Sequence, residues 1–148
     1  MEIATKHFGL IELTDEKIIT FIDELPGLGG KHYVLLSPPD MIPFSWLQSV
    51  DNPEAALVVV NPAEILSSYQ PEISGKVYEE LCFEPGDECL VLVVAVVPDD
   101  IRKMTMNLAA PIIVNVDKRL AKQEILAGEE YPLRYCPYEE YKAKGVYA

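Results

Sequence analysis

The chain has 148 residues, of which 49% are hydrophobic and 24% charged, and its formal net charge is −12. This length suits a single domain with a real hydrophobic core. The strong negative charge disfavours direct binding of nucleic acid, which depends on cationic groups that neutralise phosphate. Twelve prolines are spread along the chain and argue against long helices.

The N-terminal sequence "MEIATKHFG" has neither the basic nor the apolar region of a secretory signal. The longest apolar run, "CLVLVVAVVP", is far shorter than the ~20 residues of a membrane-spanning helix. The three cysteines, Cys82, Cys89 and Cys136, form no close pair, so neither a disulfide framework nor a zinc site is expected. We therefore expect a cytoplasmic protein that does not bind membranes, with buried or unreactive thiols.

Short strands dominate the first half of the chain. Alternating or β-branched apolar residues, separated by proline and glycine turns, predict them. The expected strands occupy residues 2–13, as a pair with a turn near His7–Gly9, and residues 17–22, 31–37, 43–50 and 55–60. In the fourth region, "PFSWLQSV", the side chains of Phe44, Trp46 and Gln48 share one face, and Leu47 lies on the other. Because each face carries an apolar residue, both faces of this strand are expected to be partly covered.

Two short helices are expected in the middle of the chain. Asn61 is a good N-cap, Pro62 suits the first helical position, and Glu64 can fold back on the cap. Pro71 keeps this helix short. A second helix is expected over residues 74–82.

The second half returns to strands. Residues 88–97 predict a long central strand, and residues 110–126 predict a hairpin with its turn at 117–121. A weak helix is expected from Pro137 onward. The pattern as a whole predicts a mainly β fold: a compact antiparallel β-barrel-like single domain over residues 1–148, with a few short helices. A flexible C-terminal tail is expected from about residue 137.

Charge is distributed unevenly. Residues 72–100 contain eight acidic residues and one lysine, a net charge of −7, whereas residues 101–128 carry +3. An acidic patch that includes Glu79, Glu80, Asp87 and Glu88 is therefore expected, either as a solubilising surface or as a binding site for a basic partner.

No common catalytic or nucleotide-binding motif is present in the sequence. An enzyme of the flavin-binding split-barrel type remains an alternative, with a phosphate pocket built from Arg102–Lys103 or from Lys118, Arg119 and Lys122. A ligand-carrying barrel is a third interpretation, in which Trp46 and Tyr33 would line a pocket; packing in the core is the preferred role for both.

Several sequence blocks together resemble the FliW family of flagellar assembly factors. They are "LPGL", "PFSWLQS", "NPAEI", "SYQPEI", "TMNLAAPIIVN" and "KRLAKQEIL", in the family's order and spacing, up to about Arg134. Two positions depart from the family pattern: Leu28 where an aromatic residue is common, and Ala121 where a glycine is usual.

The resemblance implies a non-enzymatic bacterial regulator with a β-barrel fold, no cofactor and no metal. Such proteins bind flagellin and the small basic translational repressor CsrA, and they antagonise the binding of CsrA to flagellin messenger RNA. Candidate partner-binding residues are Phe44, Trp46, Gln48, Glu79, Glu80, Asp87, Glu88, Asn107 and Asn115. For the two asparagines, capping of backbone groups is preferred over partner contact. An exposed apolar strip for flagellin is expected to involve Phe44, Ile112 or Val114.

Overall fold

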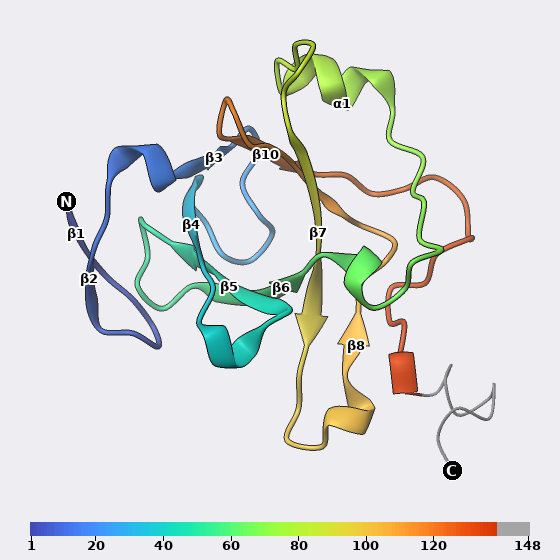
Figure 1. Cartoon of the computed structure of the whole chain (residues 1–148), viewed down its shortest axis with the longest axis horizontal. Coiled ribbons are helices and arrows are strands. Elements are labelled where there is room, and N and C mark those ends of the chain that lie inside the picture. Colours follow the sequence, from blue (N-terminus) through green and yellow to red (C-terminus); the bar gives the residue numbers. More distant parts are fainter. Residues whose placement is uncertain (139–148) are drawn as a thin grey trace.

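The structure is a computed structural model, and it describes residues 1–138. Strands make up most of its regular secondary structure, as the sequence predicts (Figure 1). The strands are β1 (Glu2–Ala4), β2 (Leu10–Glu12), β3 (Ile19–Phe21), β4 (His32–Leu36), β5 (Phe44–Ser49), β6 (Ala56–Val60), β7 (Cys89–Val96), β8 (Thr105–Met106), β9 (Ile112–Asn115) and β10 (Leu120–Gln123).

Seven of these strands close into a barrel. The order is β6-β5-β4-β3-β10-β9-β7, and β7 pairs back onto β6. The expected mainly β barrel is therefore confirmed. One pairing within residues 1–138 is not antiparallel: β3 and β10 run parallel, with Phe21 opposite Ala121. These two strands come from opposite ends of the chain, so no hairpin fixes their relative direction.

Strand β7 is the longest element and is shared by both halves of the barrel. Its first half pairs with β9 and its second half with β6 and β8. Leu92 faces the barrel interior, whereas Val93 faces an outer cluster with Met106 and Leu108. Because both faces of the strand are covered, its sequence is a continuous apolar run and does not alternate between apolar and polar residues.

The barrel interior is a packed apolar core. Phe21, Tyr33, Leu47, Val59 and Ile112 meet there, all almost completely buried. The rings of Phe21 and Tyr33 pack edge to face, with centroids 5.2 Å apart. The Tyr33 hydroxyl donates to the Gly29 carbonyl, 3.1 Å away, which satisfies the polar end of this side chain. The preferred core role of Tyr33 is confirmed.

Helical structure is sparse in the described chain. The expected helix over residues 74–82 is present as α1 (Gly75–Glu80). The helix expected after Asn61 is only a 3-10 turn over Pro62–Glu64, although Asn61 caps it by accepting from the Ala63 N–H at 3.0 Å. Beyond the turn, Tyr69 is buried in the outer cluster of β7, and its hydroxyl donates to the Leu108 carbonyl at 2.7 Å.

The predicted hairpin is formed by β9 and β10. Its turn is one residue earlier than expected, over residues 116–119, and Arg119 takes the left-handed conformation with φ 56°. Ala121 lies within β10 and is fully buried, so its departure from the family pattern falls in the core and not in the turn. Leu28, the other departure, packs against the barrel core.

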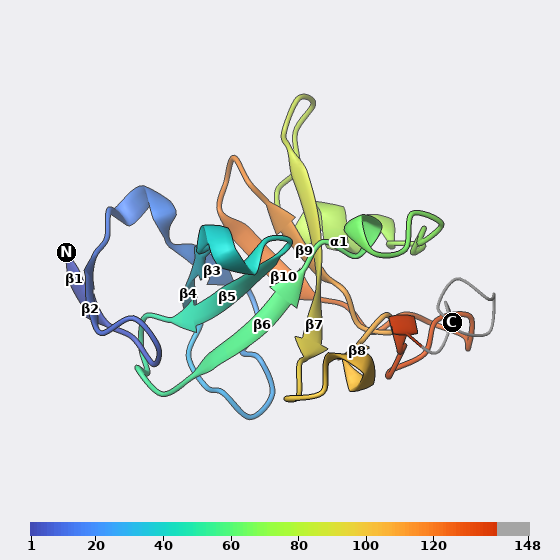
Figure 2. The ribbon, with the colours of Figure 1, turned by 60° about the horizontal axis from the view of Figure 1, so that its bottom comes forward.

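The two ends of the described chain lie on opposite sides of the barrel (Figure 2). The β1–β2 hairpin packs on one side through Ile3 and Leu13, which contact Val34 of β4. The tail and the helix expected from Pro137 fall almost entirely outside the described residues. Among the helices that are described, none is long and apolar enough to cross a membrane.

Cysteine burial differs from the expectation. Cys82 and Cys89 are exposed and Cys136 is half-buried, and all three are free thiols. Cys82 follows the end of α1 and Cys89 begins β7, where both side chains are left outside the core. Partial burial raises the pKa of the Cys89 thiol, which lowers its reactivity.

Candidate partner-binding surfaces

Exposed apolar side chains gather beside the end of β7, on the outside of the barrel. Two adjoining cavities of about 460 and 500 Å³ share Phe44 and Ile101. We call them the apolar groove; its principal residues are Ile42, Phe44, Trp46, Val58, Val97, Ile101 and Met104. Ile42 is 73% exposed and Ile101 is 59% exposed, so the groove presents large side chains that no described residue covers.

The sequence predicted part of this groove. Phe44 and Trp46 lie on β5 and line it, and Trp46 stacks on His7 with ring centroids 4.1 Å apart. Trp46 therefore does not share the core role of Tyr33. Sequence reasoning missed Ile42 and Ile101, because both lie in proline- or aspartate-rich turns and not on a periodic strand. The sequence feature that could have revealed them is a large apolar residue placed within a turn.

Two residues expected in an exposed apolar strip are not exposed. Ile112 and Val114 of β9 face the barrel interior and are buried. The prediction of an exposed strip that includes them is wrong. Strand β9 is covered on both faces, since α1 packs on its outer side against Ile113.

Gln48 is a buried side chain, although it lies on the same strand as Trp46. It is 1% exposed, and its amide nitrogen donates to the carbonyls of Ser49, Pro53 and Ala55. Its oxygen accepts from the Lys6 N–H at 3.0 Å. These bonds tie β5 to the β1–β2 hairpin, so a partner reaches this amide only if that hairpin moves.

The four predicted acidic residues lie in and around α1 and the loop that leads into β7, which we call the acidic end. Glu79 and Glu88 are exposed. Glu80 instead pairs with Lys122 at 3.0 Å, and Asp87 with Lys118 at 2.7 Å. Half of the predicted acidic patch is therefore neutralised by lysines from the β9–β10 hairpin.

Asp87 is the centre of a polar network. Lys118, together with hydrogen bonds from the Glu84 N–H and from Asn115, lowers the pKa of the Asp87 carboxyl to about 2. Lys118 also pairs with Glu84 at 2.9 Å, and its two carboxylate partners raise its own pKa. The network fastens the loop before β7 to the hairpin turn.

Asn115 is fully buried and acts as a cap. Its amide nitrogen donates to the Leu81 carbonyl at 3.0 Å and to Asp87 at 3.1 Å, and its oxygen accepts from the Lys118 N–H at 3.2 Å. The preferred structural role of Asn115 is what these contacts support: the side chain joins the end of α1, the loop before β7 and the hairpin turn.

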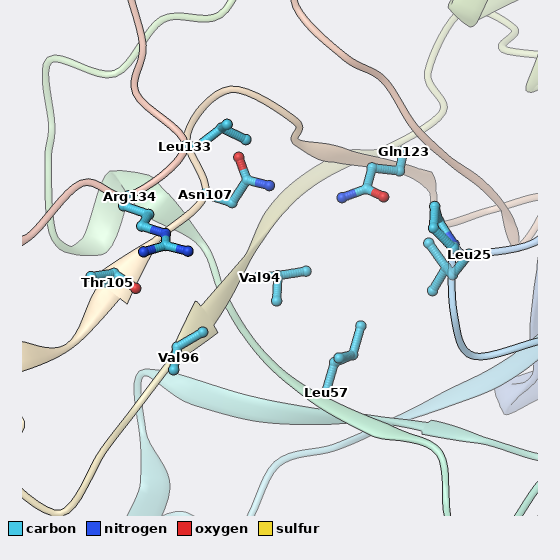
Figure 3. A pocket seen from close by; sticks show the side chains of 10 residues that line it. Leu25, Leu57, Val94, Val96, Thr105, Asn107, Gln123, Leu133 and Arg134 are labelled. Carbon is cyan, nitrogen blue, oxygen red and sulfur yellow. The ribbon is translucent and has the colours of Figure 1, made fainter.

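Asn107 has a different setting. Its oxygen accepts from the Ala109 N–H at 3.1 Å, which makes a local turn, and the side chain is only half-buried. It lines a cavity at one end of the barrel together with Gln123 and Arg134 (Figure 3). Capping and ligand contact are therefore compatible at this position.

The basic residues expected to form a phosphate pocket are engaged elsewhere. Arg102 pairs with Asp100 at 2.9 Å, and Lys118 and Lys122 pair with the acidic end. Arg119 donates to the Asp15 carbonyl. Four of the five basic residues proposed for a phosphate pocket are thus held by other groups, which weakens the flavin-binding alternative.

The apolar groove and the acidic end lie at opposite ends of β7. The acidic end precedes Cys89 and lies beside α1, whereas Val97 follows the last residue of the strand (Figure 1). Seven residue steps along a strand correspond to about 23 Å. The arrangement defines a class of protein: a small closed β-barrel with two separate and chemically different surfaces.

Comparison with known proteins identifies the family. A family model described as FliW protein matches residues 2–136. A flagellar assembly factor FliW from Geobacter sulfurreducens is 40% identical over 140 residues, which cover 95% of this chain and 88% of that protein. One from Thermoanaerobacter pseudethanolicus is 38% identical over 144 residues, covering 96% of each chain. The chain therefore belongs to the FliW family of flagellar assembly factors.

A solved structure agrees with this assignment. The crystal structure of a flagellar assembly factor FliW superposes with a TM-score of 0.85 at 34% identity, covering 93% of this chain and 97% of that one. The resemblance drawn from the sequence blocks is confirmed. The family is one of assembly factors and not one of enzymes.

Proposed function

We propose that this chain binds flagellin before export and, when free of flagellin, binds a CsrA-type translational regulator in the cytoplasm and antagonises its binding to flagellin messenger RNA. Membership of a flagellar assembly factor family supports the general setting. The two separate surfaces support the existence of two partners. The chain itself contacts neither nucleic acid nor membrane in this proposal.

The apolar groove is the observation that carries the proposal. An amphipathic helix binds by laying its apolar face in an exposed apolar groove. The apolar groove offers such a surface through Ile42, Phe44, Val97 and Ile101. The ends of flagellin are amphipathic helices that lack their partners until the filament assembles. We assign flagellin to the apolar groove because the apolar residues of the groove would otherwise be exposed to water.

The acidic end suits the regulator. A CsrA-type protein is basic, because it binds RNA, and carboxylates such as Glu79 and Glu88 steer such a partner and speed its encounter. The remaining negative charge of the chain, −12 in total, then disfavours an incoming phosphate backbone. Antagonism follows whether or not the RNA site is covered directly.

A reconstituted competition tests the proposal. The purified chain is added to a regulator bound to labelled flagellin messenger RNA, and release of the RNA is followed by fluorescence anisotropy. We expect the RNA to be released, and flagellin added afterwards to restore the RNA complex. An unchanged anisotropy, together with no regulator complex in calorimetry at tens of micromolar, would refute the regulatory part of the proposal.

A further inference from the structure

One end of the barrel is open and holds a cavity of about 450 Å³, which we call the barrel mouth. Its apolar wall includes Leu25, Leu57 and Val94, and its polar residues include Thr105, Asn107 and Arg134. Leu57 and Val94 belong to the inner faces of β6 and β7, so the mouth continues into the barrel core. Mouths of β-barrels are common places for small ligands.

Three of the polar residues gather on one side of the mouth, and Gln123 lies on the other (Figure 3). Figure 3 shows the Arg134 guanidinium directed inward next to Thr105, with Asn107 beside it, while Leu25 and Leu57 lie across the cavity. Within residues 1–138, the Arg134 guanidinium has no carboxylate partner, although the chain carries 24 acidic residues. Arg134 and the Asn107 amide nitrogen thus offer donors to an anionic group.

Apart from the Gln123 amide oxygen, the opposite wall offers few hydrogen-bonding groups. The backbone groups of Leu57 and Val94 are used by strand pairing, and the Val94 carbonyl also accepts from the Asn107 N–H at 2.9 Å. Pro26 has no N–H, and the Gln123 amide nitrogen is held by the Ala110 carbonyl at 3.1 Å. A peptide lying across this wall would leave most of its amide groups unpaired, whereas a hydrocarbon chain has none to pair.

From this geometry we propose that the barrel mouth binds a small aliphatic carboxylate. Its head group lies between Arg134 and Asn107, and its hydrocarbon tail lies along Val94 and Leu57 toward Leu25. A carboxylate accepts from a guanidinium through two parallel bonds, which gives the site its selectivity for the anion. The mouth shares no lining residue with the apolar groove, although its Val96 and Thr105 are chain neighbours of Val97 and Met104 in the groove.

Titration with octanoate tests this proposal, followed by calorimetry and by backbone amide shifts in NMR. We expect saturable binding with shifts centred on Val94, Asn107 and Arg134. Arg134→Gln should weaken octanoate binding about tenfold or more, because a charge-assisted bond is lost. Lys103→Gln, which removes one positive charge outside the mouth, should bind octanoate like the unmodified chain.

Three probes complete the experiment. Octanol, which has the same tail without the charge, should bind at least about tenfold more weakly than octanoate. Acetate, which has the head group alone, should show no saturable binding in the same range. Equal affinity for octanoate and octanol, no octanoate binding, or unchanged affinity in Arg134→Gln would each overturn the proposal. Tighter binding of an apolar tripeptide with a free C-terminus would overturn the choice of an aliphatic ligand.

Discussion

The buried side-chain amide of Asn115 connects three segments of the fold. It joins α1, the loop before β7 and the hairpin turn through three hydrogen bonds. Its position at the end of an apolar strand made a capping role predictable from the sequence. Gln48 was not predictable in the same way, because one of its four hydrogen bonds joins it to a backbone group 42 residues away.

Replacing Asn115 by alanine should destabilise the fold. The change leaves buried backbone groups without partners, at a cost of roughly 1–3 kcal/mol per group. We expect the melting temperature to fall by roughly 3–8 °C, measured by circular dichroism. Asn52→Ala is the matched control, because Asn52 caps only an exposed turn through the Glu54 N–H. An Asn115→Ala protein that melts like the unmodified chain but has lost one partner would contradict the capping role.

The Asp87 network should make stability depend on acid pH. The folded pKa of Asp87 is about 2, below the ~3.9 of an unfolded aspartate, so its contribution is fully present above about pH 4. That contribution is lost as the pH falls from about 4 toward 2. Urea unfolding should therefore show Asp87→Asn less stable than the unmodified chain near neutral pH, with the difference shrinking in acid. A difference that is constant with pH would show that the carboxylate charge is unimportant.

At the scale of elements, most strands and the local hairpins could be predicted from the sequence, but the pairing of distant strands could not. The apolar run of β7 and the hairpin of β9 and β10 have clear local signatures. The parallel contact of β3 with β10 has none, because it joins segments about a hundred residues apart. The apolar groove was only half predictable, because Ile42 and Ile101 lie in turns that carry no periodicity.

The acidic end should act on the rate of association. Glu79→Lys combined with Glu88→Lys removes carboxylates that have no ion-pair partner among residues 1–138, and should slow binding of the CsrA-type regulator several-fold in stopped-flow measurements. The dissociation rate should change little, and the effect should diminish as salt rises. Glu80 and Asp87 are left intact, because their reversal would break ion pairs within the fold.

A matched pair of reversals controls this experiment. Glu54→Lys with Glu129→Lys makes the same change in net charge at exposed positions outside the acidic end. If both pairs slow association equally, the total charge and not the acidic end steers the regulator. If neither does, the acidic end only keeps the protein soluble.

At the scale of the whole molecule, the barrel separates the two surfaces by the length of β7. A flagellin helix in the groove therefore does not cover the acidic end directly. A partner switch requires that binding of one partner lowers the affinity for the other. That coupling must come from a conformational change in the barrel or from steric overlap between the two partners. Simultaneous and uncoupled binding of both in one sedimenting species would refute the switch.

The central claim is that the apolar groove receives flagellin, and calorimetric titration of a flagellin terminal segment into matched variants tests it most directly. Ile101→Asp places a charge in the groove and should weaken binding about tenfold or more. Ile125→Asp makes the same change at a residue that is 83% exposed outside the groove, and should bind like the unmodified chain. A folded Ile101→Asp protein, with an unchanged melting temperature, that binds flagellin as tightly as Ile125→Asp would contradict the claim.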